Sequence, residues 1–409
     1  MQVLYTAAHG GFETLSKGIP LGGGAAVSER LVEEWSRTKP FSLRLITPSI
    51  LGAAAPGGSE LASFGERAYA KFCYAFERAV TEEILRYDPA STVVLANDVS
   101  EGPDFARLAA SGFAVFTIYH VDVVAYVSAI YLRGMIRPET TVRWYRRLHP
   151  ILPAMAGLIW AKQEASVRHS RGLIVPSEGM RDVLLSCYPE AAPEKIHVLP
   201  WGSFDDSQAT HEEVHALRAE FGVPNDALVL LTLSRISPEK GQDLLLEALI
   251  DWERRDDFPT RPLWLFICGE AAFMQGERFL NRLRSLARRL QRTRVIFPGY
   301  AAGARKRAFF GLADLYVFPS RHESYGLTLM EALAAGVPAV CLDHHGARSV
   351  MRREFGEMVA RTHLRDALKH MLSDGDRRRR RGEAAQAYAK TLRFPDQAAE
   401  LARMIVRNI

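Results

Sequence analysis

The sequence is poor in the features that mark several classes of protein. Its four cysteines stand singly, with no CxxC pair and no metal-like spacing, so reduced cytosolic thiols are predicted instead of disulfides or a cysteine-held metal. Basic and acidic side chains nearly balance, at 52 against 47, and the net charge of +5 excludes a general polycation for nucleic acid. The first residues contain no basic segment followed by a long apolar run, so we expect no secretory signal and a cytoplasmic location.

Long uncharged apolar runs are also lacking. The nearest one, residues 113–132, carries His120 and Asp122 at its centre, where a charge is most costly inside a bilayer. We therefore predict a strand running into a helix at this place and no transmembrane segment.

Two sequence patterns for bound cofactors and metals are missing as well. No GxGxxG follows a predicted strand with an acidic residue about twenty positions on, which disfavours an oxidoreductase. The one DxD, Asp374-Gly375-Asp376, lies in a polar turn between late helices and follows no core strand, unlike the motif of a metal-dependent sugar transferase. We expect neither a metal nor a cofactor.

The pattern that is present is a regular alternation of apolar runs and amphipathic stretches. The 409 residues are 48% hydrophobic and 24% charged, a balance that lets a chain bury large cores. Short β-branched runs between helical stretches predict parallel sheets that are covered by helices on both faces. The predicted strands are 2–6, 43–47, 92–96, 114–118, 173–175, 197–199, 228–233, 263–268, 294–297, 315–318 and 338–342.

These runs form two series, which predict two domains. The fold class is α/β, with two doubly wound, Rossmann-like parallel-sheet domains facing an interdomain cleft, the default place for an active site. We predict an N-terminal domain over residues 1–205, with a helical insertion at about 123–168, and a C-terminal domain over residues 206–394.

A loop and short helix after strand 315–318 carry the sharpest motif, PSRHESYGLTLMEALAAGVPAV. Gly326 lets a ligand approach the backbone, and the amides of Leu327 and Thr328 at the helix start are suited to a phosphate. Taken alone, the segment also fits an ordinary core helix with polar ends.

Charged side chains surround this predicted phosphate site. Glu331 lies about two turns into the helix, where it can accept hydrogen bonds from ribose hydroxyls, and Glu323 in the loop can reach a second polyol. Arg235 and Lys240 follow strand 228–233 at the same sheet edge, where they suit a diphosphate. Two carboxylates and two cations around a phosphate site indicate a nucleotide sugar.

The ordered pattern over roughly residues 225–342 resembles family 4 glycosyltransferases of the GT-B fold. The features that carry the resemblance are Glu323-x7-Glu331, Arg235 with Lys240-Gly241, the ICGE turn at 267–270 and the FPGY turn at 297–300. The resemblance implies retaining, metal-independent transfer of a hexose from a UDP- or GDP-sugar to an unidentified hydroxyl acceptor. It also implies a donor-binding C-terminal domain, an N-terminal domain on the acceptor side, and a last helix at 395–409 that crosses back to the N-terminal domain.

The same resemblance assigns roles to single residues. Arg235 and Lys240 would hold the diphosphate, Glu323 would lie near the donor sugar and Glu331 on the ribose. His120, after strand 114–118, is similar to a histidine near the reacting sugar, and the catalytic set is then His120, Glu323, Arg235 and Lys240. The donor-binding set is Gly23, Gly24, Arg235, Lys240, Gly269, Gly299, Tyr300, Glu323, Tyr325, Gly326, Leu327, Thr328 and Glu331.

The sequence departs from the family pattern in two places. WGSF follows Pro200 where an asparagine-glycine-valine-aspartate turn is common, and LDHHGARSV stands where a Gly-Gly turn and a glutamate are usual. Trp201, His344 and His345 are therefore candidates for the acceptor side, although packing explains Trp201 equally well.

Several alternatives remain open. A sugar-nucleotide epimerase, a phosphorylase of the same fold, or a non-catalytic sugar-nucleotide binding protein would share the two-domain plan. The Arg377–Arg381 run fits a solvated helix face or a peripheral contact with an anionic membrane. Aromatic and arginine residues mix within 123–169, which fits core packing with a basic face or an acceptor with apolar and anionic parts.

Overall fold

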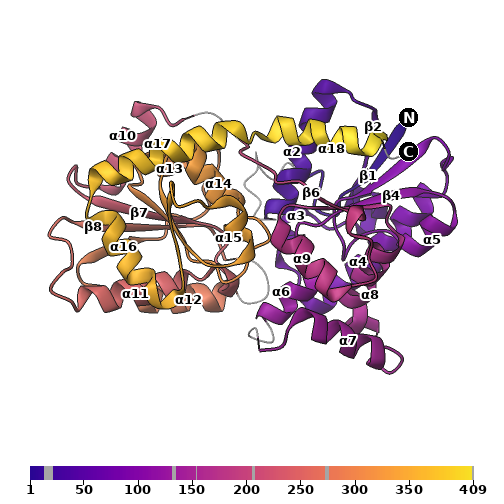
Figure 1. Cartoon of the computed structure of the whole chain (residues 1–409), viewed down its shortest axis with the longest axis horizontal. Helices are drawn as coiled ribbons and strands as arrows, with labels where there is room; N and C mark the ends of the chain where they lie inside the picture. Colours follow the sequence, from indigo (N-terminus) through magenta and orange to yellow (C-terminus); the bar gives the residue numbers. More distant parts are fainter. Residues whose placement is uncertain (13–21, 131–134, 153, 205–207, 272–275, 408–409) are drawn as a thin grey trace. The chain divides into compact units, whose positions relative to one another are not determined.

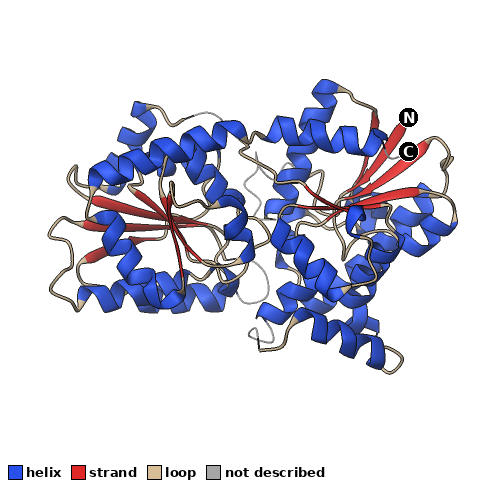
Figure 2. Ribbon diagram, viewed as in Figure 1, coloured by secondary structure: helices blue, strands red, loops and turns tan. Residues whose placement is uncertain are grey.

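Two compact units make up the described part of the chain. The structure, a computed structural model, describes residues 1–12, 22–130, 135–152, 154–204, 208–271 and 276–407. The units are Met1–Trp201 with Pro395–Ile409, and Gly202–Phe394. In each unit a sheet lies between layers of helices (Figures 1 and 2). The boundary predicted between residues 205 and 206 falls on 205–207, outside the described residues.

The first unit has a six-stranded sheet in the order β2-β1-β3-β4-β5-β6, with every pairing parallel. Its strands are β1 (Gln2–Thr6), β2 (Ser42–Ile46), β3 (Thr92–Ala96), β4 (Ala114–Ile118), β5 (Gly172–Val175) and β6 (Ile196–Val198). Its helices are α2 (Gly23–Thr38), η1 (Pro48–Ala54), α3 (Gly58–Ser63), α4 (Glu66–Ile84), α5 (Phe105–Ala110), α6 (Val123–Ile130), α7 (Pro138–Leu148), α8 (Ala154–His169), α9 (Glu178–Cys187), η2 (Pro193–Lys195) and the C-terminal α18 (Phe394–Arg407). Every residue of the central β3 is buried because helices cover both faces of the sheet.

The second unit repeats this plan with a sheet in the order β12-β11-β10-β7-β8-β9, again parallel throughout. Its strands are β7 (Leu228–Leu233), β8 (Leu263–Cys268), β9 (Thr293–Ile296), β10 (Leu315–Phe318), β11 (Ala339–Leu342) and β12 (Gly356–Val359). Its helices are α10 (His211–Phe221), η3 (Pro238–Lys240), α11 (Gln242–Glu253), α12 (Gly276–Ala287), α13 (Gly303–Leu312), α14 (Leu327–Ala334), α15 (His345–Val350), η4 (Arg361–His363), α16 (Leu364–Leu372) and α17 (Gly375–Thr391). The prediction of two doubly wound parallel-sheet domains is confirmed.

One strand escaped the sequence analysis. The edge strand β12 reads GEMV and is only partly buried, so it lacks the continuous apolar run that identifies the central strands. All eleven strands that were predicted coincide with observed strands to within one residue at each end.

The insertion and the terminal helix both pack within the first unit. Helices α6, α7 and α8 fill the predicted insertion between β4 and β5. The indole Nε1 of Trp35 on α2 donates a hydrogen bond of 3.0 Å to the carbonyl of Ala398 on α18. Residues 408 and 409 of the predicted last helix lie outside the described residues.

The arginine run of α17 is largely engaged inside the second unit. Arg378 is buried and donates to the carbonyls of Met371 and Leu372 at the end of α16. Asp374 of the DxD accepts the backbone N–H of Arg377 at 2.9 Å, so this motif caps the helix. In the part of the chain that the structure describes, no helix is both long and apolar enough to cross a membrane.

Candidate active site

Parallel strands bring their carboxyl ends to one edge, and in the second unit this edge collects the predicted donor-site residues. Arg235 follows β7, Lys240 ends the 3-10 turn η3, and the loop after β10 carries Glu323. The Lys240 Nζ lies 2.7 Å from the Glu323 Oε1, and these side chains are only 12 and 16% exposed. The structure therefore joins the two residues in a partly buried ion pair.

Glu323 is kept ionised by its surroundings. Burial alone would raise the pKa of its carboxyl, but the Lys240 charge and hydrogen bond, the nearby His344 and a 3.0 Å hydrogen bond from the Ser320 hydroxyl outweigh burial and lower the pKa. The carboxylate is an acceptor that is already charged and oriented before any ligand arrives.

The backbone of Arg235 is fixed by a neighbouring side chain, and its own side chain is partly exposed to solvent. Its backbone carbonyl accepts a 2.9 Å hydrogen bond from the Gln242 amide, and its guanidinium lies 3.8 Å from the buried carboxylate of Glu239. The side chain remains 27% exposed. A planar cation in this position can bind the oxygens of a phosphate.

Turns that contain glycine follow β8 and β9 at the neighbouring part of the same sheet edge. The N–H of Gly269 donates to the carbonyl of Gly299 at 2.8 Å, and both residues have positive φ, 138° and 82°. A Cβ on Gly269 would stand 1.9 Å from the carbonyl oxygen of Ser234, so only glycine fits. Gly269 thus shapes the edge, and Tyr300 follows Gly299 in a partly exposed position.

Helix α14 begins at this edge. Gly326 precedes it with φ 116°, and the amides of Leu327 and Thr328 have no acceptor inside the helix because they belong to its first turn. The Thr328 hydroxyl accepts a 2.8 Å hydrogen bond from Tyr316 on β10, which fixes the helix start to the sheet. Tyr325 is buried, and its hydroxyl accepts the N–H of Gly202, so its side chain supports the turn.

Glu331 has a partner that the sequence analysis missed. Lys306, on α13, places its Nζ 2.6 Å from the Glu331 Oε1. The two residues lie 25 positions apart on different helices, so no local spacing connects them. The pair holds the Glu331 carboxylate in place.

The first unit brings two of its predicted residues together. A Cβ on Gly24, in the first turn of α2, would lie 3.1 Å from the imidazole of His120, and Gly23 begins the same helix. The His120 Nε2 is 3.0 Å from the Asn97 Oδ1, and burial lowers the pKa of His120 to about 4, so the ring is neutral at neutral pH. Its ring stacks on Trp201 at 5.8 Å between centroids, so Trp201 packs inside the unit.

A polar cluster beside His120 was also missed. His9 follows β1 and lies 3.8 Å from Asp98 and 3.9 Å from Glu101, which follow β3. Polar residues directly after buried strands were the available signal. Across the described ranges no group of three or more His, Cys, Asp or Glu is arranged to hold a metal ion.

The histidines that depart from the family pattern lie beside Glu323. His344 caps α15 by accepting the Ala347 N–H at its Nδ1, and burial lowers its pKa to about 4. A neutral ring then carries its proton on Nε2, which is buried and has no hydrogen-bond partner among the described residues. His345 packs edge-on against His322 at 4.9 Å.

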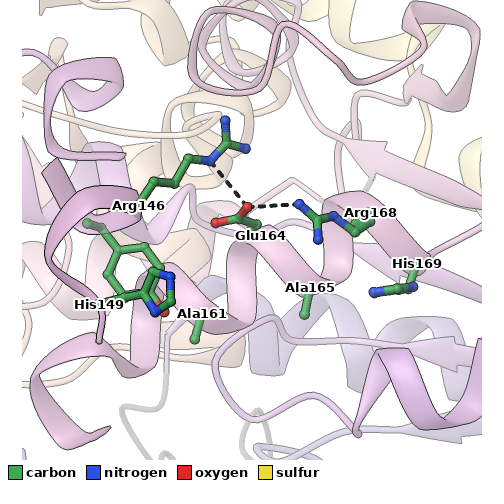
Figure 3. A pocket seen from close by; sticks show the side chains of 8 residues that line it. Arg146, His149, Ala161, Glu164, Ala165, Arg168 and His169 are labelled. Atoms are coloured by element: carbon green, nitrogen blue, oxygen red, sulfur yellow. Dashed lines mark hydrogen bonds and ion pairs between the residues drawn. The ribbon is translucent and has the colours of Figure 1, made fainter. Parts of the chain in front are cut away.

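A pocket lies elsewhere, between α7 and α8 (Figure 3). Its charged centre is Glu164, which accepts from Arg146 Nε and from Arg168 Nη2, each at 3.2 Å. The charges of both arginines are thus paired with Glu164, and the Arg168 side chain remains mostly exposed. The pocket contains none of the predicted site residues; its lining is Tyr145, Arg146, His149, Ala161, Glu164, Ala165, Arg168 and His169.

Several known proteins resemble this chain in sequence or in fold. A D-inositol 3-phosphate glycosyltransferase of Corynebacterium aurimucosum is 30% identical over 219 residues, 52% of this chain and 51% of that protein. An alpha-monoglucosyldiacylglycerol synthase of Streptococcus pneumoniae is 32% identical over 174 residues, 41% of this chain and 36% of that protein. The chain therefore spans about half the length, or less, of these curated relatives.

The solved structure of Anabaena HepE, in complex with UDP and glucose, gives a TM-score of 0.69 at 15% identity and covers 100% of both chains. This likeness shows the fold, which is GT-B. Residues 214–388, within the second unit, match the family described as glycosyl transferases group 1. The predicted resemblance to family 4 glycosyltransferases is confirmed.

Proposed function

We propose that the chain is a retaining hexosyltransferase that moves a sugar from a UDP- or GDP-sugar to a hydroxyl acceptor without a metal ion. The observation that carries the proposal is the gathering of two cations, two carboxylates and a helix start at one sheet edge of a group 1 glycosyltransferase unit. The UDP and glucose bound by HepE, a protein of the same fold, support this class of donor.

The chemistry assigned to these residues is electrostatic. Arg235, Lys240 and the first amides of α14 would bind the diphosphate and stabilise the charge that grows as it leaves. The bond between the anomeric carbon and the phosphate oxygen breaks with its electron pair going to the diphosphate, while the acceptor oxygen bonds to that carbon. The products are the glycoside, the nucleoside diphosphate and the proton of the acceptor hydroxyl.

The two carboxylates would select the donor. Glu331 would accept the ribose hydroxyls, and Glu323 would accept hydroxyls of the sugar. In the first unit, neutral His120 would lie near the reacting sugar, with Gly23 and Gly24 at the start of α2 close to the diphosphate. We place the enzyme in the cytoplasm, where nucleotide sugars would be available to it.

A binding and turnover assay tests the proposal. A panel of UDP- and GDP-sugars is screened by thermal shift, because a ligand of the folded state raises the melting temperature. The stabilising donor, isotope-labelled, is then assayed for transfer or hydrolysis, and the anomeric configuration of the product is read by NMR.

Two protein variants complete the test. Arg235→Ala is expected to weaken nucleoside diphosphate binding by about 1.5 to 3 kcal/mol, whereas Arg284→Ala on the exposed face of α12 is not. Binding without any turnover would support a non-catalytic binding protein instead. A product of inverted configuration, an epimerised donor or phosphate-dependent cleavage would each overturn the proposed reaction.

A further inference from the structure

We propose that the outer surface of α7 docks onto a lipid bilayer that contains anionic phospholipid. The α7 surface consists of Met135, Arg143, Trp144, Arg147, Leu148 and Ile151. This inference goes beyond the proposed function, since it concerns binding to a membrane and requires no turnover.

Large apolar side chains are concentrated on this surface. Trp144 and Leu148 are 48 and 45% exposed, and Met135 and Ile151 are each 79% exposed. The other large hydrophobic residues exposed in the described chain are scattered as Met1, Val121, Met358 and Val406. Single exposed apolar side chains are ordinary. Here Trp144 and Leu148 lie one turn apart on α7, and Met135 and Ile151 flank its two ends in the chain, so the concentration of four within residues 135–151 indicates an interaction surface.

The helix arranges these residues in two parallel rows. Trp144 and Leu148 are separated by four positions, as are Arg143 and Arg147, so each pair lies one turn apart on the same side of the helix. The two rows are adjacent, and all four side chains are exposed. A row of cations beside an apolar row is typical of helices that lie in a membrane interface.

The α7 surface carries a net positive charge, which favours an anionic partner. Residues 135–151 contain four arginines and one glutamate, a net charge of +3 with histidine neutral. Arg146 turns inward to Glu164 and Glu190, and Arg137 lies 3.8 Å from Glu139. No acidic side chain in the described ranges pairs with Arg143 or Arg147. The Arg143 Nε donates a 3.3 Å hydrogen bond to the carbonyl of Glu139, and the exposed guanidinium groups of both arginines can still reach phosphate groups of lipids.

The inner side of α7 is fixed, so the surface is presented without unfolding the helix. Val142 is buried in the core of the unit, and Tyr145 stacks on Trp160 of α8 at 6.1 Å. The indole of Trp160 donates to the Thr141 hydroxyl, and Glu164 joins α8 to Arg146 (Figure 3). The contacts around the pocket of Figure 3 therefore hold α7 in place beneath the docking surface.

The arginine run of α17 is a weaker alternative surface. Arg378 is buried against α16, and Arg381 lies 3.4 Å from Glu357. Only part of that run faces solvent, and no exposed cluster of large apolar side chains accompanies it in the described chain.

Vesicle binding of the full chain tests the proposal. Sedimentation compares vesicles of equal parts phosphatidylglycerol and phosphatidylcholine with vesicles of phosphatidylcholine alone, and we expect binding to the anionic vesicles only. Arg143→Glu with Arg147→Glu is expected to weaken that binding at least about tenfold, because each arginine near an anionic surface adds to the affinity. The matched control is Arg284→Glu with Arg288→Glu, another exposed pair four positions apart, which is expected to bind as the unaltered chain does.

A spectroscopic readout places Trp144 in the lipid. Four of the six tryptophans are buried and Trp160 is partly buried, so quenching by brominated lipid should come from Trp144 and disappear in Trp144→Phe while sedimentation persists. Unchanged melting temperatures show that the variants are folded. Failure of the unaltered chain to bind anionic vesicles, equal binding by the Arg143→Glu with Arg147→Glu variant, or quenching that survives Trp144→Phe would each overturn the proposal.

Discussion

Lys240 and Glu323, which lie 83 positions apart, form one ion pair of 2.7 Å at the carboxyl ends of β7 and β10. Each side chain is mostly buried, so removing one partner strands the other away from water. Lys240→Met and Glu323→Gln are each expected to lower the free energy of unfolding. The double variant should lose less than the sum of the two, with a coupling of about 1 to 3 kcal/mol in urea denaturation.

An exposed pair of similar length is the control for this cycle. Arg403 and Glu400 lie 2.6 Å apart, but their side chains are 57 and 41% exposed. Solvent screens such pairs, so the corresponding cycle should show almost no coupling. Additive losses of stability in the Lys240 and Glu323 variants would contradict a partly buried ion pair between the two residues.

The glycine turns give a prediction about backbone geometry. Gly269→Ala puts a methyl group 1.9 Å from the Ser234 carbonyl at φ 138°, so it should destabilise the protein by more than about 3 kcal/mol. Gly299→Ala has φ 82° but no atom within 4 Å of the new Cβ, and should cost about 1 to 2 kcal/mol. Equal losses in the two variants, measured by urea denaturation, would show that the close approach at Gly269 is absent.

Parts of this arrangement follow from sequence patterns and parts do not. Buried parallel strands are continuous apolar runs, so their positions and the residues that follow them, such as Arg235 and His120, were predictable. Polar residues after β1 and β3, among them His9 and Asn97, carry the same signal and are predictable in the same way. The Lys306–Glu331 pair depends on how α13 packs beside α14, and no periodicity in either segment specifies that packing.

Buried neutral histidines predict a loss of stability on mild acidification. Burial lowers the pKa values of His120 and His344 to about 4, whereas both titrate near 6.5 when the chain is unfolded. Below pH 6.5 the unfolded state therefore binds more protons, and the free energy of unfolding falls as the pH falls. Down to about pH 5, where Glu323 stays ionised, each histidine should account for up to about 2 kcal/mol.

His344→Asn separates this effect from general acid denaturation. Asparagine can also cap α15, and it has no proton to gain in this range, so the variant should show a shallower slope between pH 6.5 and about pH 5. Parallel curves for the variant and the unaltered chain would show that His344 does not titrate as its burial demands.

A direct assay can test whether sugar transfer proceeds without a metal ion. Arg235, Lys240 and the α14 amides supply the positive charge that the diphosphate requires in the proposed reaction. Transfer should therefore continue at an unchanged rate in excess EDTA. Loss of turnover that magnesium or manganese restores would contradict the proposal.

Variants of the two carboxylates, Glu331 and Glu323, should differ in their effects on binding and on transfer rate, because the two residues lie on different elements. Glu331 on α14 would bind the ribose that nucleoside diphosphate and intact donor share. Glu331→Ala should therefore weaken both by a similar factor, and Lys306→Met should do so to a smaller extent because Glu331 then loses its orienting partner.

Glu323 in the loop would touch the sugar, so Glu323→Ala should lower the transfer rate with little loss of nucleoside diphosphate affinity. Its removal also frees Lys240, which remains available to the diphosphate. Calorimetric titration and initial rates measure the two quantities, and Glu354→Ala, an exposed glutamate, is the control that should change neither. Melting temperatures first establish that the variants are folded. A normal transfer rate in folded Glu323→Ala would show that Glu323 makes no contact with the sugar. The loop and α14 would then have only a structural role.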